Sequence, residues 1–550
     1  MIKDRFGLRA FGYDLDKNCE NLSSRILEGS YKPQPGFKFY VPKASKTQRT
    51  KTLLMVEDAI VYQAIANVIA QRTYSKLKDH DNFVFGSVLN SEVELGTSIL
   101  EQEAPNYFFF KFWKSLYQKF KNSVIKSIEV DKVKYKFETD ITGFFDSIPH
   151  YNLLIALSTE FEVEDEILDM LSECLNLWSG TKESKTPGVG IPQGPQPSFF
   201  LANLLLYSLD SKMIGNAHKY YRYMDDIKIY GYEEQELLDA LVTIDCYTKS
   251  HGLSINSKKT SIEEIDPAKE DATAKELKKM DLFSLYENDE PESLIEVGKE
   301  TNKDAQLEKA LILLSEQGND GDIVLVNPST SVIDDPEDII SFWNQNIKDV
   351  EKDLAELVRI NQNGKYELVD KVNVDDIDFI RLSAKYGVAQ TALKEMNIET
   401  NPNVDLIPIW LFAYKKYFWR ANIFGGSLMH YRNNYKLKAE LIILYKNDFR
   451  LYEWVRYSII TTLAISHRFD DRELRTCFYP FLKEEESALV KISLYRLLFN
   501  HSRDEQFNAT LKKELRREQN GYLRMVIMDF IRTRDFSKMI VTELLQSIAI

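Results

Sequence analysis

The stretch YYRYMDDIKIYG, residues 220–231, places two adjacent carboxylates, Asp225 and Asp226, inside an otherwise apolar and aromatic run. Strand-like residues flank the pair, so the pattern predicts two strands joined by a turn at Met224 and Asp225. Neighbouring carboxylates repel each other, and burying them unpaired costs on the order of several kcal/mol. Magnesium prefers hard oxygen ligands and would remove that cost. Alone, however, the pair is weak evidence for a metal site, because most such pairs are ordinary solvated turns.

A third carboxylate occurs earlier, in FETDITGFFDSIPH, residues 137–150. Asp140 ends a strand-like run, and pairing of this strand with the hairpin would bring it beside Asp225 and Asp226. Three carboxylates from two strands can hold two magnesium ions roughly 4 Å apart, which activates a hydroxyl and stabilises the leaving pyrophosphate in nucleotidyl transfer. Asp146 is a rival ligand, but it lies past the predicted strand end, where capping of a helix is the simpler role.

Two further elements frame these carboxylates. GVGIPQGPQPSFFLANLLLYSLD, residues 188–210, is a glycine- and proline-rich loop that leads into an apolar helix. The N–H groups at such a helix start can face a phosphate or a base, although any strand-to-helix turn has a similar composition. HGLSINSKKTSI, residues 251–262, places Lys258 and Lys259 after a short apolar strand.

The first half of the chain mixes strands with helices, which predicts an α+β domain over residues 1–270. Strand-like runs such as FKFYV (37–41) and KYKFETDI (134–141) alternate with helical runs. In the helical run over residues 56–77, apolar side chains recur at close to a 3.6-residue period. The predicted apolar stripe comprises Val56, Ile60, Gln63/Ala64 and Asn67/Val68.

Residues 271–340 form a predicted acidic connector, and strands nearly disappear from residues 341–550. Three later segments look alike, with starts 35 and 33 residues apart: VRYSIITTL (455–463), VKISLYRLL (490–498) and LRMVIMDFI (523–531). A repeated helix pair of this length predicts an all-α helical-repeat domain of HEAT-like type. A plain helical bundle with coincidental spacing is the alternative.

The net charge of −14 is unevenly distributed. Residues 1–140 carry +5 and residues 411–550 carry +8, so the middle of the chain holds −27. The two basic ends leave a polyanionic partner open, which the overall charge alone would have argued against. Four well-separated cysteines and the lack of a long apolar run predict a soluble, cytoplasmic protein without a membrane partner.

The four elements, taken in order, resemble the palm of reverse transcriptases. The motifs read D-x-x-x-F-F-D-S-I, P-Q-G-x-x-x-S, Y-x-D-D and G-L-x-x-N-x-x-K-T. The upstream run RTKTLLMVEDAIVYQAIANVIAQ (49–71), followed by FVFGS (83–87), is similar to the fingers of the bacterial intron and retron type. The resemblance covers about residues 40–265 and implies a fingers and palm domain that polymerises DNA.

The resemblance also implies roles for individual residues. Asp140 and Asp225 would bind both Mg²⁺ ions, with Asp226 at the same centre and the Ile141 carbonyl as a further ligand. Phe145 would stack under the sugar and clash with a 2′-hydroxyl, although simple core packing also explains it. The remaining nucleotide contacts would be Gln193 and Gly194 beside the incoming nucleotide, Arg49 and Lys51 on the triphosphate, and Lys259 as the acid near the pyrophosphate.

Several departures from the family pattern put template handling in doubt. Leu53-Leu54 stands where the fingers usually carry Ile-Pro, and Thr50 replaces a proline after Arg49. Pro195 and Pro197 stand in the loop where the family often has small residues. The acidic stretch after the palm is also a poor surface for a primer–template duplex.

A reverse-transcriptase palm joined to helical repeats resembles the Abi group, the bacterial abortive-infection polymerases of phage defence. This implies template-independent DNA synthesis from dNTPs, primed on a protein hydroxyl, with single-stranded DNA attached covalently to a homo-oligomer that a phage-derived trigger activates. Tyr13, Tyr31 and Tyr40 are the candidate priming residues. The alternatives are a templated RNA-dependent DNA polymerase of retron or defence type, and a helical-repeat binding scaffold with a decayed polymerase site.

Overall fold

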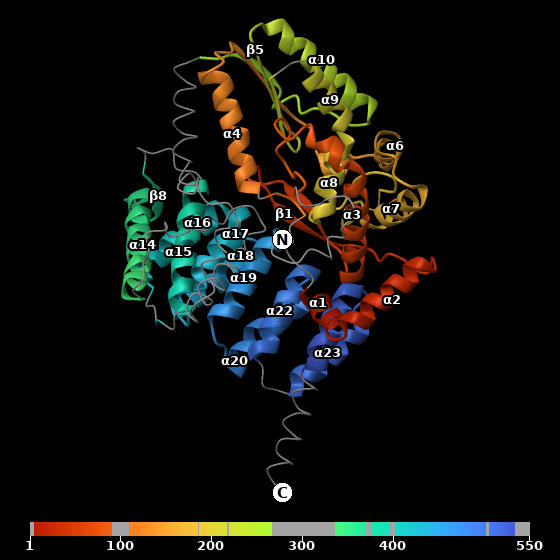
Figure 1. The fold of residues 1–550 in the computed structure, drawn as a ribbon. Coiled ribbons are helices and arrows are strands. Elements are labelled where there is room, and N and C mark those ends of the chain that lie inside the picture. The colour runs from red at the N-terminus through yellow and green to blue at the C-terminus, as the bar shows by residue number, and fades with distance from the viewer. Residues whose placement is uncertain are drawn as a thin grey trace. The chain divides into compact units, whose positions relative to one another are not determined.

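The computed structural model describes most of the chain in two compact units (Figure 1). The mixed unit comprises Ile2–Lys38 and Thr50–Leu282, and the helical unit comprises Met1, Phe39–Arg49 and Phe283–Ile550. The described residues are 5–90, 109–111, 113–184, 186–216, 219–266, 336–362, 364–369, 376–395, 398, 402–501 and 505–533. The predicted connector, apart from residues 336–340, and the boundary at residue 270 lie outside them.

A four-stranded antiparallel sheet, in the order β4-β5-β3-β6, forms the centre of the mixed unit. Its strands are β3 (Tyr135–Asp140), β4 (Lys219–Tyr223), β5 (Asp226–Gly231) and β6 (Ser261–Glu264). The predicted strand–turn–strand is therefore confirmed, with Met224 and Asp225 in the turn. Met224 has a φ of 57°, in the left-handed region that non-glycine residues rarely adopt.

The strand predicted before Lys258 is wrong. The segment forms only an isolated bridge between Ile255 and Ile141, and the sheet strand β6 begins after the lysines. Leu253 is buried in the core, which explains the apolar pattern. The Asn256 side chain accepts a hydrogen bond from the Lys258 backbone N–H at 3.2 Å, so the chain turns before a ladder can extend.

The two faces of the sheet pack against different helices. Phe137, Ile227 and Ile229 belong to the main core, together with buried residues of α10 (Glu234–Ser250). Tyr230 belongs to a smaller core with Phe120 and Val124 of α4 (Trp113–Glu129). Figure 1 shows α4 and α10 running beside the strands. Because alternate side chains of a strand point to opposite faces, the register decides which residues reach each core.

The remaining elements of the mixed unit surround this sheet. They are α1 (Arg5–Gly12), α2 (Leu15–Leu27), β1 (Phe37–Pro42), β2 (Gln48–Leu53), α3 (Val56–Lys78), α5 (Phe144–Ser147), α6 (His150–Phe161), α7 (Asp165–Trp178), α8 (Gln196–Leu205) and α9 (Tyr207–Gly215). Strands β1 and β2 pair with each other as a separate two-stranded sheet whose distal part, Phe39–Arg49, is grouped with the helical unit.

The helix predicted over residues 56–77 is confirmed as α3, and its buried face differs from the series of residues whose period indicated the helix. Ile60 is exposed and Ala64 faces solvent. The buried stripe instead includes Val61, Tyr62, Ile65, Ala66, Ile69, Ala70 and Thr73. Both stripes are rich in apolar residues, so a 3.6-residue period alone does not select one of them.

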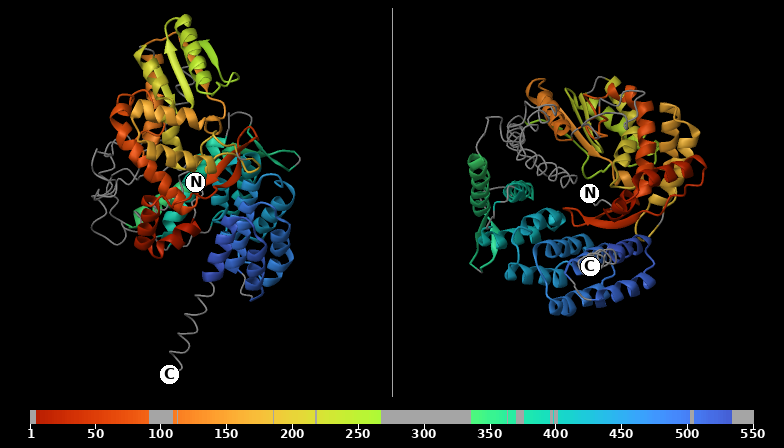
Figure 2. Two further views of the ribbon diagram at one scale, coloured as in Figure 1. Left: turned by 90° about the vertical axis from the view of Figure 1, so that its right-hand side faces the viewer. Right: turned by 60° about the horizontal axis from the view of Figure 1, so that its bottom comes forward.

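Paired helices dominate the helical unit (Figures 1 and 2). Its elements are α14 (Pro336–Leu357), β7 (Val358–Ile360), β8 (Tyr366–Leu368), α15 (Asp376–Glu395), α16 (Ile407–Lys416), α17 (Ala421–Leu428), α18 (Tyr435–Asn447), α19 (Glu453–Ser466), α20 (Asp471–Glu473), α21 (Tyr479–Glu484), α22 (Ala488–His501) and α23 (Glu505–Arg517), with residues 521–533 also helical.

Helix packing in this unit follows an alternating pattern. Helix α15 packs on α17, α17 on α19, and α19 on α22, while α16, α18 and α21 each pack against the helix that follows. The three similar segments lie in α19, in α22 and in residues 521–533. Such packing fits stacked helix pairs, and the HEAT-like type stays a prediction. In the described part of the chain, no helix combines the length and apolar character needed to cross a membrane.

Replacement of Phe137 by alanine tests the central position of β3. The side chain is fully buried between β5 and β6, so Phe137→Ala should lower the free energy of unfolding by about 3–5 kcal/mol. Urea denaturation followed by circular dichroism measures the change. Leu238→Ala, at an exposed position of α10, is the control and should change stability by less than about 0.5 kcal/mol. Equal effects of the two variants would contradict the assigned core.

Candidate functional site

Three carboxylates lie at one end of the central sheet. Strands β3 and β5 run antiparallel with Asp140 directly opposite Asp226. Asp225 precedes Asp226 in the turn between β4 and β5. Opposite residues in an antiparallel pair have Cβ atoms about 5 Å apart, so the register brings together the side chains that the sequence predicts as a group.

A second charged pair accompanies these carboxylates on the same face of the sheet. Glu138 lies opposite Lys228, and the Lys228 ammonium donates a hydrogen bond to Glu138 at 2.6 Å. Because residues two apart on a strand share a face, Glu138 and Asp140 face the same way, as do Asp226 and Lys228. The face is therefore polar at this end, which suits a site open to charged ligands.

Lys259 supplies a cation to the carboxylate group. Its ammonium forms an ion pair with Oδ2 of Asp140, and this hydrogen bond raises the pKa of Lys259. The lysine side chain is 66% exposed, whereas that of Asp140 is 15% exposed. The segment that carries the lysine is anchored to β3, because the Asn256 N–H donates to the Asp140 carbonyl at 2.8 Å. Lys259 can thus leave or approach Asp140 without movement of its backbone.

The pKa of Asp226 lies above its ordinary value. Burial by surrounding protein atoms is the largest cause, and the nearby charges of Glu138, Asp225 and Asp140 add to it, while Lys228 opposes it. The side chain still reaches solvent at the turn, so water screens part of the repulsion. The raised pKa marks a carboxylate that lacks sufficient positive charge around it.

The donor set at this end of the sheet fits magnesium. Oδ1 of Asp140 is buried and has no hydrogen-bond partner in the described structure, and carboxylate oxygens are the hard ligands that magnesium prefers. Among the described residues, no three His, Cys, Asp or Glu side chains already converge on one point. The Lys259 ammonium is paired with Oδ2 of Asp140, so a metal at this carboxylate would use Oδ1 or displace the lysine. The Ile141 side chain is buried, and the ligand role of its backbone carbonyl stays a prediction.

The loop with Gln193 and Gly194 is attached to strand β2. The Thr52 N–H donates to the Gln193 carbonyl at 2.9 Å. Gly194 has a φ of 141°, and a Cβ there would lie 3.0 Å from the Thr52 carbonyl, so the close approach requires glycine. Lys38, which sequence reasoning missed, donates to the Thr52 hydroxyl at 2.8 Å and to the Trp178 carbonyl. Burial lowers the pKa of Lys38 to about 8, against the nearby charge of Asp146.

The predicted triphosphate contacts lie on β2, on alternate residues of one face. Arg49 is exposed and Lys51 is half-buried. Lys51 immediately precedes Thr52, so the strand places it next to the loop residues described above. Asp146 lies in the short helix α5, beyond the end of β3. This agrees with the predicted position past the strand end, for which Asp146 ranks below Asp140 as a metal ligand.

Phe145 lies mostly inside the core. Its ring is 8% exposed and makes an edge contact with Phe199, with ring centroids 5.0 Å apart. Its backbone carbonyl accepts a hydrogen bond from Ile191 at 2.8 Å, which ties helix α5 to the glycine-rich loop. The neighbouring Phe144 is 2% exposed and provides a natural comparison. The structure therefore shows a core role for Phe145, and its contact with the sugar stays a prediction.

The three candidate priming tyrosines differ strongly in accessibility. Tyr13 is 77% exposed, whereas Tyr31 is buried and its hydroxyl donates to Asp58 at 2.5 Å. The Tyr40 backbone N–H donates to Glu453, inside the helical unit, and its side chain is half-buried. Burial and the Asp58 hydrogen bond also raise the pKa of Tyr31. Tyr31 is therefore disfavoured as a nucleophile.

Sequence reasoning missed Tyr117 of α4. Its ring packs edge-on against Tyr223, with centroids 5.3 Å apart, and lies close enough to Asp226 for that carboxylate to act on its pKa. Burial is the largest cause of the raised pKa of Tyr117. This 36% exposed tyrosine therefore reaches the electrostatic range of Asp226 from a helix outside the sheet. The position of Tyr117 near Asp226 depends on the packing of α4 against β4, so the local sequence around Tyr117 gave no signal of it.

Sequence reasoning also missed the buried pair of Arg222 and Asp210. Arg222 stands in β4, two residues before the turn, and Asp210 stands in α9. Both are essentially inaccessible to solvent. The sequence did carry a signal for this pair, because Arg222 and Asp210 are each a charged residue inside an apolar run.

Three comparisons with known proteins place this geometry in context. Residues 41–294 match the family described as reverse transcriptase (RNA-dependent DNA polymerase). No curated protein matches the chain. Among solved structures, telomerase from Candida tropicalis with the TWJ fragment of telomeric RNA is similar, with a TM-score of 0.32, 11% identity, and coverage of 84% of this chain and 68% of that one. Telomerase from Candida albicans, also with the TWJ fragment, is similar with a TM-score of 0.31, 10% identity, and coverage of 92% of this chain and 64% of that one. TM-scores this low do not establish a shared fold.

Asp226→Asn should stabilise the metal-free protein at neutral pH. The raised pKa means that the charged carboxylate costs folding stability once the pH exceeds its folded pKa, and asparagine removes that cost. The thermal midpoint in EDTA should rise by roughly 1–3 °C, because solvent screens much of the repulsion. The gain should disappear below the ordinary aspartate pKa of 3.8, where the carboxyl is protonated in both states.

Scanning calorimetry measures this midpoint. Asp239→Asn, on the surface of α10, is the matched control and should leave it unchanged. A lower midpoint for Asp226→Asn at neutral pH would contradict the assigned repulsion.

Proposed function

Because residues 41–294 match the reverse transcriptase (RNA-dependent DNA polymerase) family, we propose that this chain synthesises DNA from dNTPs with magnesium, without a template and from a tyrosine hydroxyl of its own, in defence against phage. One observation carries the polymerase part of this proposal. Asp140 and Asp226 face each other across β3 and β5, with Asp225 in the adjoining turn.

The three carboxylates would hold two Mg²⁺ ions. Bound there, the ions would lower the pKa of the attacking hydroxyl and stabilise the negative charge of the leaving pyrophosphate. Asp140 is held in place by its backbone bond to Asn256, and Asp225 and Asp226 are held by the hairpin. These residues therefore orient the reacting groups with little rearrangement of the backbone.

Lys259 would serve as the acid for the leaving pyrophosphate. It remains protonated at neutral pH, because its hydrogen bond with Asp140 raises its pKa. Its long, exposed side chain can swing from Asp140 towards a phosphate oxygen. Arg49 and Lys51 on β2 would bind the triphosphate, and Gln193 and Gly194 would contact the nucleotide.

Protein priming and the absence of a template rest on the resemblance to the Abi group. The altered loop at residues 193–198 and the helical unit in the second half of the chain support them. Tyr13 and Tyr40 stay candidates for the primer, and Tyr117 joins them because of its position near Asp226. A covalent DNA–protein product and oligomeric assembly belong to the same proposal.

A templated RNA-dependent DNA polymerase is the second candidate, since the family match is to enzymes of that description. Sequencing of the product separates the two candidates. A product complementary to a supplied or co-purified RNA favours templating, and a sequence unrelated to any RNA favours the Abi type. A pure scaffold is disfavoured, because the matched domain belongs to an enzyme family and retains the three carboxylates.

Purified protein incubated with dNTPs and Mg²⁺ should gain covalently attached DNA. Denaturing gels with a radiolabelled nucleotide and intact-protein mass spectrometry measure the product, and peptide mapping identifies the attachment residue. Asp225→Asn should reduce synthesis by roughly a thousandfold or more, since it removes a metal ligand. Asp239→Asn is the control. Absence of any DNA product, with or without added RNA and primer, would exclude the polymerase proposal, and unchanged phage protection by Asp225→Asn would favour the scaffold.

Phe145→Val should relax the choice of sugar. If the Phe145 edge excludes a 2′-hydroxyl, removing it should raise ribonucleotide incorporation relative to deoxynucleotide incorporation by roughly tenfold or more. Steady-state kinetics with dGTP and GTP measure the ratio. Phe144→Val removes a neighbouring buried ring and should lower stability without changing this ratio. If Phe145→Val and Phe144→Val show the same ratio of ribonucleotide to deoxynucleotide incorporation, Phe145 has a core role alone.

A further inference from the structure

We infer that a buried network of Arg222, Asp210 and Asn203 positions the Met224–Asp225 turn and thereby sets the geometry of the carboxylate site. The inference rests on the proposed polymerase function and assigns positioning roles within it. None of the three side chains touches the carboxylates. They act through the backbone of the turn.

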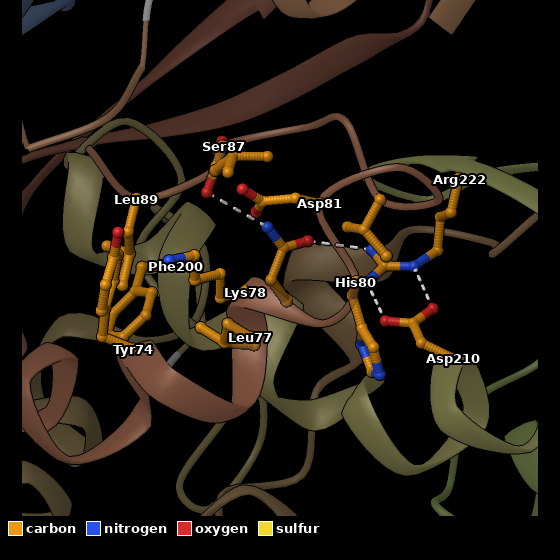
Figure 3. Close-up of a pocket in the computed structure, with 13 residues that line it drawn as sticks. Tyr74, Leu77, Lys78, His80, Asp81, Ser87, Leu89, Phe200, Asp210 and Arg222 are labelled. Carbon is orange, nitrogen blue, oxygen red and sulfur yellow. Dashed lines mark hydrogen bonds and ion pairs between the residues drawn. The ribbon is translucent and has the colours of Figure 1, made fainter. Parts of the chain in front are cut away.

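The Arg222 guanidinium divides its hydrogen bonds between two tasks, of which Figure 3 shows the one towards Asp210. Its Nε and Nη2 donate to the two carboxylate oxygens of Asp210, at 2.7 and 2.5 Å. Its Nη1 donates to the Met224 carbonyl at 2.8 Å and to Oδ1 of Asn203 at 2.9 Å. The fork of the guanidinium therefore links a helix to the turn in one rigid, planar group.

Asp210 keeps this guanidinium charged and fixed. Burial opposes the charge of Arg222, but the charge and hydrogen bonds of Asp210 raise its pKa above the ordinary value. The Tyr220 hydroxyl donates a further hydrogen bond to Asp210 at 2.6 Å. A buried carboxylate with these three donors has one favourable orientation, so Arg222 has one too.

The segment FVFGS (83–87) supports the turn from its other side. Arg222 and this segment exchange backbone hydrogen bonds, Phe85 N–H to the Arg222 carbonyl at 2.9 Å and Arg222 N–H to the Phe83 carbonyl at 2.8 Å. Asn203 donates to the Gly86 carbonyl at 2.6 Å. The same asparagine therefore holds both Arg222 and the segment.

Gly86 brings the segment into direct contact with the turn. A Cβ at this position would lie 2.6 Å from the Met224 backbone N and 2.9 Å from its Cγ, which is closer than atoms can approach. Met224 itself holds a left-handed φ of 57°, a conformation that needs support from its surroundings. The Arg222 bond to its carbonyl and the contact with Gly86 provide that support from two sides.

Gly86→Ala tests the steric half of this support. The added methyl must displace the turn, and because misplacement of catalytic groups by about 1 Å costs up to roughly 100-fold, kcat for DNA synthesis should fall by roughly 10- to 100-fold. The KM for dNTP should change less than kcat. Binding of Mn²⁺, measured by electron paramagnetic resonance on the full chain, should weaken. Gly215→Ala is the matched control, because a Cβ there meets no atom within 4 Å.

Arg222→Lys tests the hydrogen-bonding half. Lysine retains the charge opposite Asp210 but cannot also reach the Met224 carbonyl and Asn203. It should therefore lower kcat and Mn²⁺ binding as Gly86→Ala does, with a thermal midpoint closer to the wild type than that of Arg222→Met, which leaves Asp210 buried without its cation.

These measurements decide the inference even if one variant does not fold. Lower kcat and weaker Mn²⁺ binding in a folded Gly86→Ala or Arg222→Lys protein support it. Unchanged kcat and Mn²⁺ binding in Gly86→Ala, or the same loss in Gly215→Ala, overturn it. If the wild type makes no DNA, the proposed function fails, and the comparison of Mn²⁺ binding between wild type and Gly86→Ala still decides the positioning role.

Discussion

The antiparallel register of β3 and β5 is the constraint on which the site depends. It places Asp140 opposite Asp226 and, on the same face, Glu138 opposite Lys228, while Phe137 points into the core. A shift by one residue would exchange the two faces, burying the carboxylates and exposing the aromatic ring. The apolar face of the sheet therefore specifies the chemistry of the polar face, because burial of the core residues fixes the only register in which the carboxylates meet.

Electrostatic repulsion among these carboxylates is the cost of that arrangement. Lys259 and Lys228 offset it in part, one through Asp140 and the other through Glu138. Burial, as the largest cause, and the residual repulsion together raise the pKa of Asp226. Inside the core, by contrast, Arg222 and Asp210 form a fully matched pair, so the scaffold is electrostatically satisfied while the site is not. An unsatisfied site on a satisfied scaffold is the arrangement expected where a cation and a charged substrate bind.

The sequence predicted the hairpin, the third carboxylate and the mixed-then-helical organisation, because these follow from alternation, spacing and composition. It did not determine the buried face of α3, because Ile60 on one face and Val61 and Tyr62 on the other are all apolar and only tertiary packing selects one face. It missed Tyr117 and Lys38 because their relevance depends on pairings between distant segments. Arg222 and Asp210 were visible as charges in apolar runs, but their partnership depends on the packing of α9 against β4.

The loop at residues 192–198 departs from the family pattern at Pro195 and Pro197, and this departure leaves the loop and the following helix intact. Pro195 is the N-cap of α8 and Pro197 lies within its first turn, positions at which a missing N–H breaks no helical hydrogen bond. Ser198 donates to the Pro192 carbonyl at 2.5 Å and bonds with Tyr62, which closes the loop onto α3. The prolines thus stiffen the loop rather than disrupt it. Any effect on a template must come from what their rings exclude, and Pro197 is buried, so that effect is confined to the half-buried Pro195 beside Gly194.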